Sequence, residues 1–316
     1  MGKGMDQLTN PLISRFANLR TDTNERLFNA VAQYYERIAN LPVVEMYFTY
    51  ALSTNERGRT TAGLLEKQRG LDGCSYLDIG CAYAGFLVAF AERGASVMGI
   101  EIDPVLIEIG KANLADAGLD ARIFQRDATR IEQLVELVNR FDIITCNDVI
   151  EHVGNPSALV ENISLLLRRG GVAYLEIPNR NHPRFVLEDG HYQLFGITLL
   201  DRQEAELYYK TLRPQGIYNT QFYLELDQYE SIFNRAGLSL SMLPETFDSY
   251  TVESTRADLV NLGQRANERL STVPEVVRDE TDKRLSEYLR TADAYNKDDF
   301  FARYGPSFWR VMAAKN

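Results

Sequence analysis

The sequence predicts an α/β fold in which a parallel sheet is covered by helices on both faces. From Tyr76 onward, apolar runs of strand length alternate with longer runs that have helical periodicity, which is typical of such a sheet. The stretch YLDIGCAYAGF (76–86) is a short strand that ends in a turn of small residues, and VMGIE (97–101) is a second strand. Together they form a βαβ unit that ends in Glu101.

The first seventy residues are expected to form a helical N-terminal cap. Leu27, Val31, Tyr34, Tyr35 and Ile38 recur at spacings of three and four residues, which predicts a helix with one apolar face. A second apolar stretch covers 43–52, and the polar segment 55–59 is expected to be exposed. Residues 71–316 are predicted to form one ligand-binding domain.

The elements of this domain follow from the same alternation. After the strand that begins at Tyr76, we expect the following order: helix Phe86–Arg93, strand Ser96–Glu101, helix Pro104–Ala117, strand Ala121–Gln125, helix Thr129–Asn139, strand Phe141–Cys146, helix Pro156–Arg168 and strand Gly171–Ile177. Further along, a helix over 226–236 ends at Gly237, and the strands Leu238–Leu243 and Phe308–Ala313 complete the sheet.

Two segments interrupt the alternation and are predicted to be insertions, at about 179–226 and 250–296. The first contains His182 and His191 and a helical stretch near 200–212, and the second is predicted to form two helices. Segments that follow the carboxyl end of a strand in this way are usual places for substrate contacts. We therefore expect the insertions to form a substrate lid or a homodimer contact.

Composition excludes several classes of protein. The chain has 316 residues, of which 45% are hydrophobic, so it can bury a large core. A net charge of -10 argues against nucleic acid as a partner, because nucleic-acid-binding proteins carry a basic surface. No apolar run reaches 18 residues and no amino-terminal signal is seen, so we expect a cytoplasmic protein without membrane contact.

The cysteines give no sign of a metal site. Cys74, Cys81 and Cys146 are odd in number and lack a C-x-x-C pair, so neither a disulfide framework nor a zinc site is indicated. No metal is therefore expected, and the three thiols are interpreted as buried.

The βαβ unit predicts an adenosine-containing ligand without phosphates. Small residues after the first strand let a ligand approach the main chain where the next helix opens, and Glu101 is placed to accept hydrogen bonds from two ribose hydroxyls. Ala82 and Ala84 stand where glycines are usual, and their Cβ atoms would crowd a pyrophosphate. We also expect the turn to be limited to backbone angles that alanine tolerates.

Five segments, in order, resemble class I S-adenosylmethionine-dependent methyltransferases: LDIGC (77–81), GIE (99–101), QRDA (125–128), FDIITCNDVIEHV (141–153) and LRRGGV (167–172). The VIEHV turn (149–153) resembles more narrowly the ubiquinone-biosynthesis-like branch, which methylates small molecules. The resemblance covers about residues 73–243 and the last strand. It implies a Rossmann-like, seven-stranded mixed sheet whose last strand lies antiparallel between two others.

The resemblance also implies S-adenosylmethionine as cofactor and a role for each matched residue. Asp78 would bind the methionine amino group, Glu101 the ribose, and Asn147 would face the sulfonium. The remaining expected cofactor contacts are Gly80, Cys81, Ala82 and Gly85 at the methionine, Ile102 on the adenine face, and Asp127 with Ala128 at the adenine edge.

Each assignment has a structural alternative. Asp78 could cap the turn, Glu101 could be a solvated strand end, and Asp127 could cap the helix predicted from Thr129. His182 is interpreted as a loop residue. One aromatic group could line an acceptor-binding wall or simply belong to the core: Tyr208, Tyr209, Tyr218, Phe222, Tyr223 and Tyr229.

The candidate catalytic residues are His152, His191 and Asp148. The sulfonium is already an activated donor, so the protein must chiefly align the acceptor and exclude water. An aliphatic or sugar hydroxyl also needs a base of the kind that histidine supplies. We therefore expect methyl transfer to a hydroxyl oxygen of a small molecule, such as a natural product, a sugar or a quinone-like compound. C- or N-methylation, a noncatalytic binding protein and an NAD-dependent oxidoreductase are the alternatives.

Overall fold

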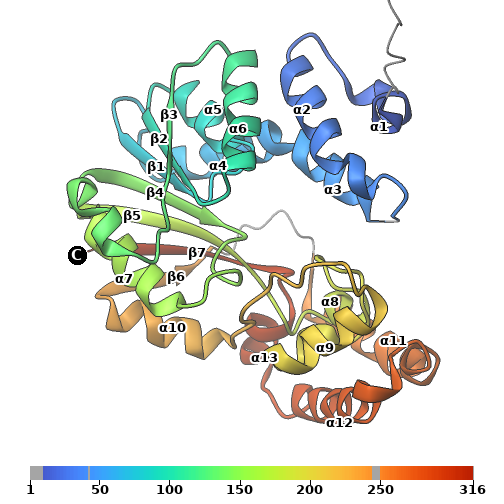
Figure 1. Cartoon of the computed structure of the whole chain (residues 1–316). Coiled ribbons are helices and arrows are strands. Elements are labelled where there is room, and N and C mark those ends of the chain that lie inside the picture. The colour runs from blue at the N-terminus through green and yellow to red at the C-terminus, as the bar shows by residue number, and fades with distance from the viewer. Residues whose placement is uncertain (1–9, 42, 244–249, 316) are drawn as a thin grey trace, which may run out of the picture. The chain divides into compact units, whose positions relative to one another are not determined.

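The computed structural model describes residues 10–41, 43–243 and 250–315, so parts of the predicted cap lie outside the described residues, whereas both predicted insertions lie within them. Seven strands form one sheet in the order β3-β2-β1-β4-β5-β7-β6 (Figure 1). The strands are β1 Ser75–Ile79, β2 Ser96–Glu101, β3 Arg122–Gln125, β4 Phe141–Asn147, β5 Leu167–Pro178, β6 Leu238–Met242 and β7 Phe308–Lys315. The predicted Rossmann-like fold is confirmed.

The chain divides into two compact units. Unit 1 holds residues 1–128 and 132–144, and unit 2 holds residues 129–131 and 145–316. The helices of unit 1 are α1 Pro11–Arg15, α2 Glu25–Tyr35, α3 Val44–Leu52, α4 Thr54–Glu66, α5 Gly85–Ala91 and α6 Pro104–Asp116. The domain boundary predicted near residue 70 stays a prediction.

The amino-terminal helices of unit 1 pack directly on its βαβ unit. Leu27 and Val31 of α2 are fully buried, as their helical spacing predicts, and α2 lies against α6. The Leu27 amide donates a hydrogen bond of 2.9 Å to the Asp116 carboxylate. The hydroxyls of Tyr35 and Tyr83 lie 2.6 Å apart. The predicted cap is therefore attached to α6 and to the turn after β1.

Helices α4 and α5 cross at a contact where only glycine fits. The segment 55–59, which was expected to be exposed, forms the first half of α4, and Gly58 within it is buried. A Cβ on Gly58 would lie 2.6 Å from the Gly85 carbonyl oxygen, and a Cβ on Gly85 would lie 2.3 Å from the backbone of Thr54. The expected exposure is found at Glu56 and Arg59 but is wrong at Gly58, because close helix packing buries the backbone there.

The crossover between β3 and β4 contains no α-helix, so the predicted helix Thr129–Asn139 is wrong. Two 3₁₀ turns, Ile131–Gln133 and Val135–Leu137, occupy the segment. Leu134 and Leu137 are buried while Val135 is 64% exposed. An apolar spacing of three matches the 3₁₀ period, and the Gln133 side chain accepts a hydrogen bond from the Asp127 amide instead of continuing a helix.

The turn after β1 adopts backbone angles that glycine normally supplies. Ala82 has φ 38° and Ala84 has φ 59°, both in the left-handed region. The expectation that this turn is limited to angles that alanine tolerates was therefore wrong. The turn also packs closely on α6, where a Cβ on Gly110 would lie 2.7 Å from the Ala82 carbonyl oxygen and 3.3 Å from the Ala84 Cβ.

Replacing Ala82 with glycine is expected to stabilise the protein by about 0.5 kcal/mol. A left-handed conformation costs a non-glycine residue about 1–2 kcal/mol, and glycine would remove this cost. The greater freedom of glycine in the unfolded chain offsets about 0.5–1 kcal/mol of the stability gained. Urea unfolding measures the change. Ala115→Gly, at an exposed site inside α6, is the control and should lose about 1 kcal/mol. Equal losses in both variants would contradict the strain at Ala82.

In unit 2, the last strands run antiparallel as expected. Strand β7 pairs with β5, with Trp309 opposite Ile177, and with β6, with Ala313 opposite Leu240. Trp309 is fully buried. The helices of this unit are α7 Pro156–Leu166, α8 Pro183–Leu187, α9 Arg202–Leu212, α10 Leu226–Arg235, α11 Val252–Leu270, α12 Glu275–Ala292 and α13 Lys297–Tyr304.

The two insertions of unit 2 share one hydrophobic core. Helices α8, α9, α11, α12 and α13 gather together in Figure 1, although about forty residues of chain separate α9 from α11. Tyr208 of α9, Leu262 of α11 and Leu285 of α12 are buried in this core. Helix α13 was not predicted. The insertions are therefore one helical subdomain, and their roles as lid or dimer contact stay predictions.

Candidate functional site

The residues expected to bind the ribose and the methionine lie in unit 1, where β1 and β2 end. Glu101 is 6% exposed, so its interpretation as a solvated strand end is wrong. One oxygen of its carboxylate accepts hydrogen bonds from the amides of Ile102 and Asp103, at 2.8 and 3.0 Å, and the other accepts from Ala82 at 3.0 Å. Asp78 is also buried. Glu101 thus fixes the turn after β1 to the end of β2.

The other residues expected to contact the methionine lie in the same turn after β1. The amides of Gly80 and Cys81 both donate to the Ile100 carbonyl, and Gly80 has φ 70°. Cys81 is buried. Position 85 must be glycine because a Cβ there would collide with Thr54, so its identity is explained by packing independently of cofactor binding. Ile102 is 61% exposed, so its side chain is accessible to a ligand.

The predicted adenine-edge residues follow β3. Asp127 is partly buried and Ala128 is buried. The proposed capping role of Asp127 fails, because the helix that it was expected to cap does not form. Its role at the adenine edge stays a prediction.

In unit 2, Asn147 is the last residue of β4 and Asp148 begins the loop that follows. The Asn147 side-chain oxygen accepts a hydrogen bond of 2.9 Å from the Glu176 amide, which orients the side chain. Its Nδ2 is buried and has no hydrogen-bond partner among the described residues. Asp148 has φ 54° and donates its amide to the Glu176 carbonyl. The unused Asn147 donor fits the expectation that this side chain meets a ligand.

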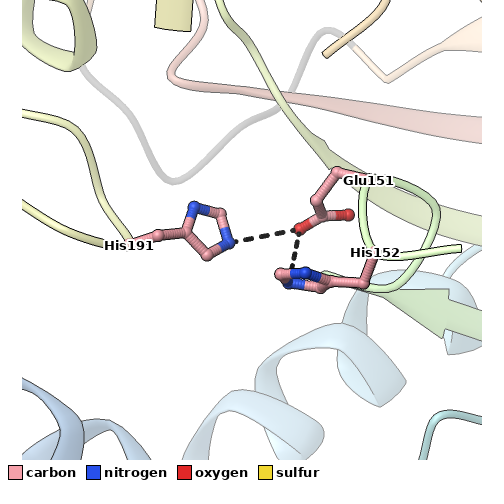
Figure 2. Close-up of side chains that lie close together, drawn as sticks. All are labelled: Glu151, His152 and His191. Atoms are coloured by element: carbon pink, nitrogen blue, oxygen red, sulfur yellow. Dashed lines mark ion pairs between the residues drawn. The ribbon is translucent and has the colours of Figure 1, made fainter. Parts of the chain in front are cut away.

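Glu151, His152 and His191 form a compact cluster in unit 2 (Figure 2). The Nε2 atoms of both imidazoles point at the same carboxylate oxygen, Oε1 of Glu151, and each lies 3.6 Å from it. Glu151 is fully buried, whereas the side chains of His152 and His191 are 26% and 22% exposed. Glu151 and His152 come from the loop after β4, and His191 comes from the first insertion.

The outer nitrogens of both imidazoles have partners of their own. Nδ1 of His152 lies 3.2 Å from the Asn219 carbonyl oxygen, and Nδ1 of His191 lies 2.7 Å from the Tyr223 hydroxyl. The buried Asp189 carboxylate accepts hydrogen bonds from the backbone amides of 191, 192 and 194. These contacts fix both rings with Nε2 facing Glu151.

Burial and charge together set the protonation of the cluster. Burial alone would raise the pKa of Glu151. The two imidazoles lower this pKa by more than burial raises it, so the net shift is downward. Burial lowers the pKa of His152 below its ordinary value. Burial also disfavours protonation of His191, yet Glu151, Asp189 and Asp148 together raise its pKa. The two imidazoles therefore favour the ionised form of Glu151, and the three acidic side chains favour a proton on His191.

Sequence reasoning found the two histidines of the cluster but not Glu151 or Tyr223 as their partners. Glu151 could have been identified from its position beside His152 in the VIEHV turn. Tyr223 belongs to the aromatic group for which the sequence left a binding wall or a core position open. Phe222 of this group is 39% exposed. The following members are buried in the core: Tyr208, Tyr209, Tyr218 and Tyr229. His182 is buried at the start of α8, away from the cluster.

The class of the protein follows from its family. The model of the family described as "Methyltransferase domain" matches residues 25–241, so the chain belongs to this family. The expected class, a class I S-adenosylmethionine-dependent methyltransferase, is confirmed, and S-adenosylmethionine is its cofactor. The alternative of an NAD-dependent oxidoreductase is wrong.

Particular relatives include the ubiquinone biosynthesis O-methyltransferases of Leptothrix cholodnii, 32% identical over 117 residues, and of Coxiella burnetii, 33% identical over 122 residues. The matches cover 37% and 39% of this chain and 49% and 51% of those proteins. The chain thus spans about half the length of the curated relatives that it matches. Phosphoethanolamine N-methyltransferase 2 of Haemonchus contortus has a solved structure with TM-score 0.43 and 17% identity, covering 81% of this chain and 52% of that one.

Across the described ranges, no helix has both the length and the apolar character needed to cross a bilayer.

Proposed function

We propose that this protein transfers the methyl group of S-adenosylmethionine to a hydroxyl oxygen of a small-molecule acceptor, and that the Glu151–His152–His191 cluster activates that hydroxyl. The observation that carries the proposal is the cluster itself, a buried carboxylate faced by two partly exposed imidazoles. The names of the relatives, which are O-methyltransferases of ubiquinone biosynthesis, support a quinone-like acceptor.

Oxygen acceptors are favoured over carbon or nitrogen because of what the cluster can do. An amine with a free lone pair attacks a sulfonium without losing a proton first, whereas a hydroxyl gains most of its nucleophilicity on deprotonation. A fixed set of one carboxylate and two imidazoles is suited to removing or replacing that proton. Asp148 adds negative charge near His191 and thereby supports a positive charge in the cluster.

The direct test uses radiolabelled S-adenosylmethionine with a panel of phenols, catechols, sugars and amines. We expect label in a hydroxyl-bearing acceptor and, in His152→Ala and His191→Ala, a loss of turnover of at least 10²-fold. If both variants stay within a few-fold of the parent on the true acceptor, the cluster has no part in the reaction. Label only in amines, or in none of the acceptors, would favour N-methylation or a noncatalytic binding protein.

Glu101→Gln is expected to weaken S-adenosylmethionine binding about 10-fold. The amide replaces one acceptor oxygen by an NH₂ group, so it cannot accept from the ribose and from all three backbone amides together. Hydrogen bonds to charged groups contribute about 1.5–3 kcal/mol each. Isothermal titration gives the Kd, and Glu108→Gln on the exposed face of α6 is the control. An unchanged Kd in a folded Glu101 variant would contradict the ribose role.

A homodimer through α11 and α12 is also part of the proposal. Val260 and Val276 on these helices are 61% and 59% exposed, and a contiguous apolar surface that included both would favour association. Light scattering of the parent and of Val260→Lys measures the oligomeric state. A monomeric parent would contradict the dimer without affecting the proposed reaction.

A further inference from the structure

The distances within the Glu151–His152–His191 cluster are not those of hydrogen-bonded ion pairs. Charge-assisted N–H···O contacts are about 2.7–2.9 Å long, but both Nε2 atoms lie 3.6 Å from the Glu151 carboxylate oxygen. Both carboxylate oxygens are buried and have no hydrogen-bond partner among the described residues. A buried carboxylate is stable only when it is paired, hydrogen-bonded or bound to a metal.

We propose that Glu151, His152 and His191 bind a divalent transition-metal ion of the Zn²⁺ type, and this inference rests on the proposed function. The three donor atoms lie within 4.8 Å of one another. Ligands held at about 2.0–2.1 Å from a tetrahedral ion are about 3.3–3.4 Å apart. The two separations of 3.6 Å from Glu151 would shrink by a few tenths of an ångström, and the two imidazole nitrogens, which lie within 4.8 Å of each other, would approach by up to about 1.4 Å.

The donor set selects the class of metal. Two imidazole nitrogens and one carboxylate oxygen form a ligand set found in catalytic zinc sites, which keep a fourth position open. Mg²⁺ prefers oxygen ligands, so two nitrogens disfavour it. Glu151 comes from the loop after β4 and His191 from the first insertion, so the ion would join two segments that the sequence separates by forty residues.

The outer contacts of both imidazoles match those of metal ligands. A metal-bound histidine usually donates its other ring N–H to an oxygen, which fixes the ring and its tautomer. His152 has the Asn219 carbonyl oxygen at Nδ1, and His191 has the Tyr223 hydroxyl oxygen there. With both Nδ1 atoms protonated, both Nε2 lone pairs face Glu151 and are available to an ion.

The open position lies on the exposed side of the cluster. Glu151 is fully buried beneath two imidazoles that are 26% and 22% exposed, so a fourth ligand enters from solvent. The acceptor hydroxyl is that ligand in the proposed reaction. The cation stabilises its deprotonated form and the proton goes to water. The oxygen then attacks the methyl carbon while the S–CH₃ bond breaks and its electron pair returns to sulfur.

The test measures metal binding directly. Protein freed of metal by a chelator is titrated with Zn²⁺ and Mg²⁺ by calorimetry, and Co²⁺ is followed by its visible absorption bands. We expect one Zn²⁺ or Co²⁺ per chain, no comparable Mg²⁺ binding, and at least 100-fold weaker binding in Glu151→Gln and in His191→Ala. Glu188→Gln, an exposed glutamate of the same insertion, is the control and should bind as the parent does.

Tyr223→Phe tests the outer contact in a variant that keeps its ring and is expected to fold. It should weaken Zn²⁺ binding about 10–100-fold because the His191 ring loses its hydrogen-bond acceptor. Tyr218→Phe, also within this aromatic group, is the matched control and should bind Zn²⁺ with the affinity of the parent. Equal Zn²⁺ affinity in the parent and in the Tyr223, Glu151 and His191 variants would overturn the proposal, as would an absence of binding to the parent.

The metal inference and the proposed function fail in different ways. If the parent binds no Zn²⁺ but methylates a hydroxyl, the metal inference is wrong and the proposed reaction stands. If metal-free protein methylates a hydroxyl at the rate of the Zn²⁺-loaded protein, the ion has no part in the reaction. If Zn²⁺ binds through Glu151 and His191 but no hydroxyl acceptor is methylated, the site stands and the proposed reaction is wrong.

Discussion

Replacing Glu151 with glutamine is expected to lower the turnover number for methyl transfer by about 10²–10⁴-fold, the range that general acid–base groups contribute. The amide keeps the shape of the side chain but removes the charge that both imidazoles face. Affinity for S-adenosylmethionine should stay within a few-fold, because Glu151 is not among the residues expected to bind the cofactor. The kinetic signature is therefore a change in kcat without a matching change in KM for the cofactor.

Single-turnover kinetics with the identified acceptor and calorimetry with the cofactor make this measurement. Glu188→Gln, an exposed glutamate of the first insertion, controls for the loss of one carboxylate from unit 2 and should leave kcat unchanged. A Glu151→Gln variant that keeps its fold and turns over within about three-fold of the parent would contradict the role of the cluster. A loss confined to cofactor affinity would mean that Glu151 acts on binding rather than on the acceptor.

Gly58→Ala and Gly63→Ala are expected to change stability in opposite directions although both sites lie in α4. A Cβ at Gly58 would lie 2.6, 2.9 and 3.0 Å from backbone atoms of Gly85 and Phe86, which cannot move without shifting α5. Overpacking of this kind costs about 1–3 kcal/mol, and contact with rigid backbone places the loss near about 3 kcal/mol. The nearest atom to a Cβ at Gly63 is the end of Arg93, at 3.7 Å.

Gly63→Ala should accordingly gain about 0.5–1 kcal/mol, because alanine has the higher helix propensity. Chemical denaturation of the two variants and the parent measures both changes. Loss of stability in both, or in neither, would contradict the close contact of α4 with α5. The shift of α5 should also weaken cofactor binding in Gly58→Ala, because α5 begins at the turn that Glu101 holds.

The sheet could be predicted because its signal is local. Each of the strands β1, β2 and β4 is an apolar run of the right length with a turn after it, and the observed bounds differ from the predicted ones by one residue at most. The crossover 129–139 could not be predicted, since Leu134 and Leu137 fit a helical and a 3₁₀ spacing equally well. Only the packing of the folded chain decides between the two.

The cluster shows the same division between local and long-range information. His152 could be singled out because it stands in a motif, and Glu151 stands beside it. The contact of Glu151 with His191, and of His191 with Tyr223, joins residues that are 40 and 32 positions apart. No periodicity encodes such a contact. The left-handed angles of Ala82 and Ala84 were missed because alanine, unlike glycine, does not signal such angles in a sequence.

The helical core shared by the two insertions has a consequence for how acceptor choice can evolve. His191 is supported by Asp189 and by a loop that ends at Gly196, where an added Cβ would lie 2.7 Å from the Thr281 methyl group of α12. A substitution at Thr281 of α12 can therefore move the loop that carries His191 without changing β1 or β2. Acceptor choice and cofactor binding could in this way be altered separately, because they depend on different parts of the chain.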